Sequence, residues 1–155
     1  MVERQREVVP SLFSRDDLER IEKAIRRVEK RTSGEIRVII GKRYDAGVAS
    51  TFEKARLDFN AYRMWDTREK TGVLILVLAE AREFAILADS GIHAKYPQAY
   101  WDGLAKELCG YFTTGEFAFG IVRIVEYVGE KLALHFPRAL DDVDELPNSV
   151  VVKEV

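Results

Sequence analysis

One apolar run constrains any fold that this chain can adopt. Residues 73–79 (VLILVLA) are apolar throughout, with no alternation of polar residues, which is typical of a strand covered on both faces of a sheet. Only Glu80-Ala81-Arg82-Glu83 separate this run from a second apolar segment at 84–88 (FAILA). Because four residues are too few for a crossover helix, we expect the two segments to pair as an antiparallel hairpin, with 73–79 as the central strand.

The N-terminal half predicts a helix, a strand and a second helix. Ser14 followed by acidic residues is typical of a helix start, and the apolar residues after it recur at helical spacing. A strand is expected at 35–40 and a helix from residue 48 to about residue 62, with a loop at 41–47 between them. Since a helix separates 35–40 from 73–79, we expect these two strands to run parallel through a right-handed crossover. The apolar stripe expected on the second helix consists of Phe52, Ala55, Phe59 and Tyr62.

The C-terminal half predicts two more helices. One begins at Pro97 and stops at Thr113-Thr114-Gly115, and the other runs from Phe117 to Pro137. The acidic segment that follows leads to 150–152 (VVV), which could add an edge strand. With 155 residues, of which 47% are apolar, the chain is long enough to bury roughly 68–70% of its unfolded surface around one core. We divide it into an N-terminal extension (1–13), one α/β domain (14–138) and an acidic tail (139–155).

Charge and cysteine content exclude several classes of function. The chain has 24 Lys and Arg against 26 Asp and Glu, so no overall basic field favours nucleic acid. Its one cysteine, Cys109, forms no intramolecular disulfide and is expected to be a small core residue. No apolar stretch has the length of a signal peptide or a membrane span. We therefore expect a cytoplasmic protein with no membrane insertion.

Three separate stretches predict a functional surface at one edge of the sheet. The starts of two parallel strands and the end of the antiparallel strand must lie at the same edge, which brings together 33–35, 66–71 and 89–93. Oxygen ligands in the number found there suit a hard cation such as Ca²⁺ or Mg²⁺. The candidate metal ligands are Glu35, Asp66, Glu69 and Asp89, and the other residues expected at this edge are Arg68, Lys70 and His93.

Each candidate also has a purely structural interpretation. Asp89 is equally suited to capping the turn after its strand, and Glu35 to a surface ion pair with Arg68 or Lys70. Asp66 and Glu69 would then be solvated loop charges, and His93 a histidine at a helix entry. Further from the edge, His135 and Trp101 are expected to be structural, and Trp65 to be exposed near the site.

The motifs together resemble the TPM domain family. The resemblance rests on TSGEIRVII, TREKTGVLILVLAEAREFAILADSGIH, the break at Gly115-Glu116-Phe117 and ELPNSVVV, and it extends from about Leu18 to Val152. It implies a three-layer α/β/α sandwich with a mixed sheet. It also implies acid phosphatase activity, as in plant thylakoid-lumen members, or divalent-cation binding, as in some bacterial ones. Without a signal or anchor, this chain resembles the short soluble subgroup.

The residues favour binding over catalysis. A cysteine phosphatase needs its cysteine in a phosphate-cradling loop, whereas Cys109 falls within a predicted helix. Glycine-rich nucleotide motifs are absent from the sequence, so no nucleotide cofactor is expected. We therefore expect a binding or scaffold domain with an unidentified protein partner, tuned by Ca²⁺ or Mg²⁺. Metal-assisted hydrolysis of phosphate monoesters is the alternative, with Asp89 at a strand end as its nucleophile.

Overall fold

The architecture was analysed in a computed structural model that describes residues 13–41, 50–112, 117–138 and 150–152. Four expectations concern segments wholly or mainly outside these residues: the N-terminal extension, the loop at 41–47, the stop at 113–115 and the acidic part of the tail. In chain order the elements are α2 (Arg15–Glu29), β1 (Glu35–Gly41), α3 (Thr51–Ala61), β2 (Gly72–Leu78), β3 (Glu83–Ala88), α4 (Ser90–His93), α5 (Gln98–Leu108), η1 (Cys109–Phe112), α6 (Phe117–His135) and β4 (Val150–Val152).

The sheet is mixed and has the strand order β3-β2-β1-β4. β1 pairs in parallel with β2, β2 pairs antiparallel with β3, and β4 adds to the other side of β1 in parallel. The parallel crossover, the hairpin and the additional edge strand at 150–152 are thus confirmed. β2 is buried along its whole length, as expected for the central strand.

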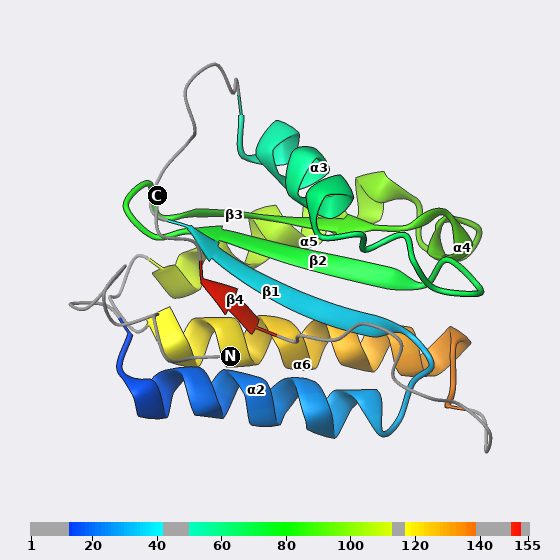
Figure 1. The fold of residues 1–155 in the computed structure, drawn as a ribbon, viewed down its shortest axis with the longest axis horizontal. Coiled ribbons are helices and arrows are strands. Elements are labelled where there is room, and N and C mark those ends of the chain that lie inside the picture. Colours follow the sequence, from blue (N-terminus) through cyan, green and yellow to red (C-terminus); the bar gives the residue numbers. More distant parts are fainter. Residues whose placement is uncertain (1–12, 42–49, 113–116, 139–149, 153–155) are drawn as a thin grey trace.

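Helices cover both faces of this sheet and make a three-layer α/β/α sandwich (Figure 1). On one face α2, α5 and α6 pack on the side chains of Ile36, Val38 and Ile40 and their counterparts in β2 and β3. On the other face α3 packs on β2 and β3 through a smaller apolar cluster that includes Ala55, Phe59 and Met64. Figure 1 shows α3 above the sheet, with α2 and α6 below it.

Local sequence chemistry explains where the first helix begins. The Ser14 side chain accepts a hydrogen bond from the Asp17 backbone N–H, and the Asp17 carboxylate accepts one from Ser14 in return. This reciprocal capping box satisfies two backbone donors that the helix itself cannot pair. The buried residues of α2 are Leu18, Ile21, Ala24, Ile25 and Val28, which confirms the predicted apolar face.

Two expectations about side-chain burial were wrong. Cys109 is exposed rather than in the core, because α5 ends at Leu108 and the chain continues as the tighter turn η1, which shifts the helical register. Phe52 is 36% exposed, whereas Lys54 and Asp58 are buried on α3. Trp101 is fully buried and Trp65 is exposed, as predicted.

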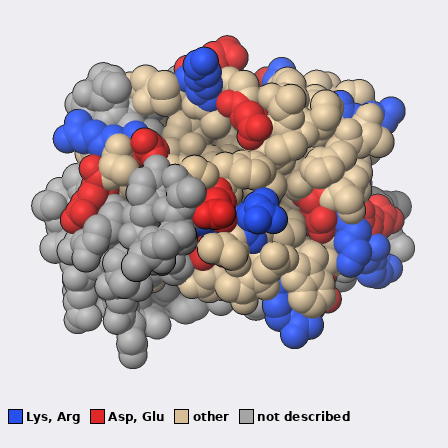
Figure 2. Space-filling model, turned by 90° about the horizontal axis from the view of Figure 1, so that it is seen from above, with Lys and Arg blue, Asp and Glu red and all other residues tan. Residues whose placement is uncertain are grey.

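The charged surface has no dominant sign where α3 covers the sheet. Figure 2, which looks onto this face, shows acidic and basic side chains interspersed. This agrees with the near-balance of charges in the sequence. Within the part of the chain that the structure describes, no helix combines the length and the apolar character needed to cross a membrane.

Candidate functional site at the Asp89 edge

The three predicted stretches do meet at one edge of the sheet. The backbone N–H of Glu35 donates to the Thr71 carbonyl at 3.0 Å, and that of Asp89 donates to the Gly72 carbonyl at 2.9 Å. Glu35 is also the register partner of Gly72. The ends of β1, β2 and β3 that carry these residues lie at the right in Figure 1, beside α4. The predicted placement of Glu35 and Asp89 at the same edge is confirmed.

Gly91 fixes how closely the loop before β2 approaches α4. Its N–H donates to the Lys70 carbonyl at 2.8 Å. A Cβ at Gly91 would overlap the carbonyl oxygen of Glu69 and lie 2.5 Å from that of Lys70. Lys70 itself has a positive φ of 57°, which turns the loop against α4. Only a residue without a side chain permits this close backbone approach.

Asp89 joins β3 to α4 and uses only one of its two carboxylate oxygens. Oδ1 accepts a hydrogen bond of 2.7 Å from the Ser90 backbone N–H, so Asp89 is the N-cap of α4. Oδ2 is buried and accepts no hydrogen bond from any residue that the structure describes. Buried carboxylate oxygens are normally paired, because removing one from water without compensation costs free energy. This atom is the clearest candidate for contact with a ligand.

Asp89 lines a hollow of about 220 Å³ between α3 and α4, which we call the Asp89 hollow. From α3 it is lined by Arg56, Phe59 and Asn60, and on the opposite side by Asp89, Ser90 and His93. The His93 Nε2 lies 2.8 Å from the Ala88 carbonyl oxygen, which holds the ring beside the end of β3. The hollow thus combines a carboxylate, a guanidinium, an amide, a hydroxyl and an imidazole around the Phe59 ring.

Comparison with known proteins identifies the family of this chain. The TPM domain family profile matches residues 10–131, which include α2 to α5 and most of α6. The chain belongs to the TPM domain family. No curated protein matches it.

Solved structures of similar proteins share the fold. The BA42 protein of the psychrophilic bacterium Bizionia argentinensis is 34% identical, with a TM-score of 0.82 over 94% of this chain and 98% of its own. The N-terminal domain of cg2496 from Corynebacterium glutamicum is 15% identical, with a TM-score of 0.63 over 88% of this chain and 83% of its own. The N-terminal domain of a P. gingivalis protein is 18% identical, with a TM-score of 0.62 over 84% of each chain. The last two likenesses concern the fold alone.

The other predicted site residues of this TPM domain have different surroundings. Glu35 is 3% exposed, so its interpretation as a surface ion pair was wrong. Alternation along β1 places it on the same face as Arg37. Burial lowers the pKa of the Arg37 guanidinium, while nearby Tyr62 and Glu35 act in the opposite direction. Arg37 also donates to the Tyr62 carbonyl at 3.0 Å, which ties β1 to the end of α3.

The loop before β2 carries exposed charges, as expected if Asp66 and Glu69 are solvated loop residues. Asp66 pairs with Arg63 at 3.4 Å, and both side chains are more than 60% exposed. The Lys70 Nζ donates to the Trp65 carbonyl at 2.8 Å. Glu69 and Arg68 are exposed. Over 13–41, 50–112, 117–138 and 150–152, no three His, Cys, Asp or Glu side chains are grouped as they would be around a metal ion. The four-carboxylate site stays a prediction.

Sequence reasoning missed the contribution of α3 to this region. Arg56 and Asn60 were not among the predicted site residues, yet both line the Asp89 hollow. Their spacing of four residues, with Phe59 between them, places all three close together on one helix surface. That spacing was the available signal, but only the packing of α3 against β3 shows what the surface faces.

Proposed function

We propose that this TPM domain is a binding or scaffold module whose ligand site is the Asp89 hollow, with a divalent cation, Ca²⁺ or Mg²⁺, as the ligand. The observation that carries the proposal is the buried Asp89 Oδ2, which has no hydrogen-bond donor among the described residues. A hard cation is a suitable partner for such an oxygen, because it compensates the lost hydration of the carboxylate.

The rest of this edge supports the proposal in part. Residues 69 and 70 lie against Gly91 through their backbone carbonyls, so Glu69 belongs to the segment packed beside Asp89 and is the second ligand we propose. Asp66 is a weaker ligand, because its carboxylate already pairs with Arg63. Glu35 is buried beside Arg37 on β1, and we leave it out of the proposed ligand set.

Calcium-dependent melting tests the proposal. A cation that binds only the folded state stabilises it by RT ln(1 + [L]/Kd), about 2.7 kcal/mol at a hundredfold excess over Kd. For a domain of this size we expect the melting temperature to rise by about 5–10 °C. The variant Asp89→Asn should lose this rise. It should keep nearly the same melting temperature in chelator, since asparagine can still accept the capping hydrogen bond from Ser90.

A matched variant separates this effect from a general loss of negative charge. Asp16→Asn removes an exposed carboxylate in the first turn of α2 and should keep the full response to calcium. An unchanged melting temperature of the unmodified protein with Ca²⁺ and with Mg²⁺ would contradict the cation proposal and leave an interaction domain without a metal. Turnover of an aryl phosphate that needs the cation and disappears in Asp89→Asn would favour the phosphatase alternative instead.

A further inference from the structure

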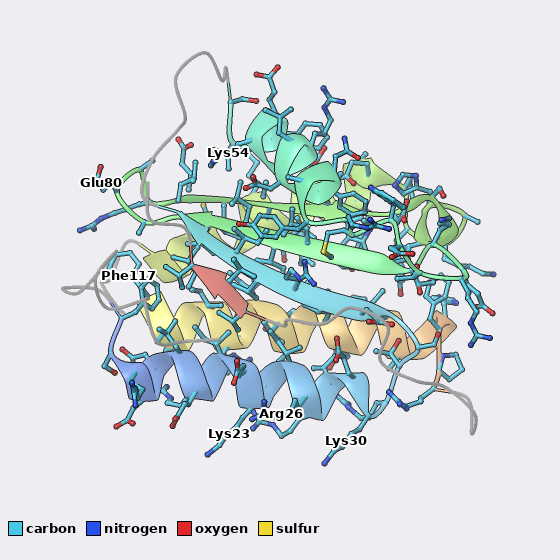
Figure 3. The ribbon with its side chains drawn as sticks, viewed as in Figure 1. Lys23, Arg26, Lys30, Lys54, Glu80 and Phe117 are labelled. Atoms are coloured by element: carbon cyan, nitrogen blue, oxygen red, sulfur yellow. The ribbon has the colours of Figure 1, made fainter. Side chains whose placement is uncertain are left out.

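A cationic surface lies far from the Asp89 hollow, on the outer side of α2. The second half of this helix and the two residues after it carry five exposed cations, which we call the α2 basic stripe: Lys23, Arg26, Arg27, Lys30 and Arg31. Their spacing of three and four residues places them on adjoining turns. Figure 3 shows Lys23, Arg26 and Lys30 together on the side of α2 that points away from the sheet.

A second segment of the chain adds another cation to this surface. Arg138 follows α6, and its backbone N–H donates to the Arg31 carbonyl at 3.3 Å. Its guanidinium donates to the Glu29 carbonyl at 2.6 Å. Arg138 is therefore held beside the end of α2, where it lines a hollow of about 330 Å³ with Arg26, Glu29 and Lys30.

The acidic residue in this hollow already has a structural role. The Glu29 Oε2 accepts a hydrogen bond of 2.9 Å from the Ile36 backbone N–H, so this carboxylate is engaged at the edge of β1. Arg26 pairs with Glu22 at 3.4 Å and Arg27 with Glu126 at 3.8 Å. Lys23 and Lys30 take part in none of the ion pairs among the described residues, which leaves the stripe with an excess of positive charge.

Helix stability accounts for only part of this arrangement. Cations in the last turn of a helix interact favourably with its dipole, which explains Arg26 and Arg27. It does not explain Lys23, which is nearly two turns from the end, or the convergence of Arg138 from another segment. Two guanidinium groups and one ammonium around a single hollow are the groups that proteins use to bind phosphate, because guanidinium donates two parallel hydrogen bonds to such an anion.

We propose that the hollow formed by Arg26, Lys30 and Arg138 binds a phosphoryl group. The nearly balanced charge of the chain gives no long-range attraction for polyanions, so recognition depends on these local contacts. The proposal is independent of the cation site, since none of these residues lines the Asp89 hollow.

Backbone NMR of the full chain tests this site with two probes that separate the sources of a phosphoryl group. With inorganic phosphate, we expect saturable amide shifts around residues 26–31 and 136–138 that an equal ionic strength of sodium chloride does not produce. Vesicles of phosphatidylglycerol in phosphatidylcholine test a lipid headgroup by cosedimentation. The double variant Arg26→Gln/Lys30→Gln should lower the affinity at least tenfold, and added salt should weaken binding by the unmodified chain.

The control variant Arg15→Gln/Lys106→Gln removes one exposed arginine and one exposed lysine elsewhere and should bind as the unmodified protein does. Binding of phosphate that only the stripe variant loses would establish a site for a free phosphate group. Binding of the anionic vesicles alone, with the same variant sensitivity, would establish a headgroup site. The proposal is overturned if neither probe binds, or if the control loses as much affinity as the stripe variant.

Discussion

Replacing Gly91 with alanine is expected to destabilise the domain by about 3 kcal/mol. The new Cβ would meet two backbone carbonyls, those of Glu69 and Lys70. Backbone atoms cannot rotate aside as a side chain can, so the whole loop before β2 must move, at the upper end of the usual overpacking cost. Urea unfolding of both proteins measures the effect. The same movement carries Glu69 away from Asp89, so the variant should also lose the response to calcium.

The matched control is Gly103→Ala on α5. A Cβ at Gly103 has no neighbour within 4 Å, and the position is inside a helix. Alanine there should stabilise the domain by about 0.5–1 kcal/mol through its higher helix propensity. If Gly91→Ala were as stable as the unmodified protein, the loop would not be held against α4, and the geometry proposed for the Asp89 edge would be wrong.

The sequence predicted the sheet because its strands have unambiguous patterns. The unbroken apolar run and the short turn after it leave one way to pair β2 with β3, and the intervening helix then favours β1 parallel to β2. These two strand pairings alone predict that Glu35 and Asp89 lie at the same edge of the sheet. Topology therefore located the candidate site, although it could not say which side chains face one another there.

The sequence failed where burial depends on packing between layers. The stripe predicted on α3 included Phe52 and did not include Lys54, yet Lys54 is 1% exposed and Phe52 is 36% exposed. Helical periodicity predicts the direction of the apolar face of a helix. It does not predict which polar side chains of that helix become buried when it packs on the sheet. The same limit applies to Cys109, whose exposure follows from the change from α5 to η1 rather than from its apolar neighbours.

Removing the Asp58 carboxylate is expected to cost more than any surface substitution. Asp58 Oδ2 lies 3.9 Å from the Lys54 Nζ, and the two side chains are only 6% and 2% exposed. Asp58→Ala would leave a buried ammonium without this carboxylate, and breaking a buried ion pair typically lowers the free energy of unfolding by about 3–5 kcal/mol. Urea unfolding at neutral pH gives this value directly.

Two further variants test whether burial is the cause. Asp66→Ala breaks an ion pair with Arg63 that has similar sequence spacing but is more than 60% exposed, and it should change stability by less than about 0.5 kcal/mol. The double variant Lys54→Met/Asp58→Leu removes both buried charges and should recover most of the stability lost in Asp58→Ala, since apolar side chains of similar volume carry no desolvation penalty. If Asp58→Ala behaves like Asp66→Ala, the pair does not hold α3 on the sheet. The apolar cluster around Ala55, Phe59 and Met64 would then account for the attachment of this helix.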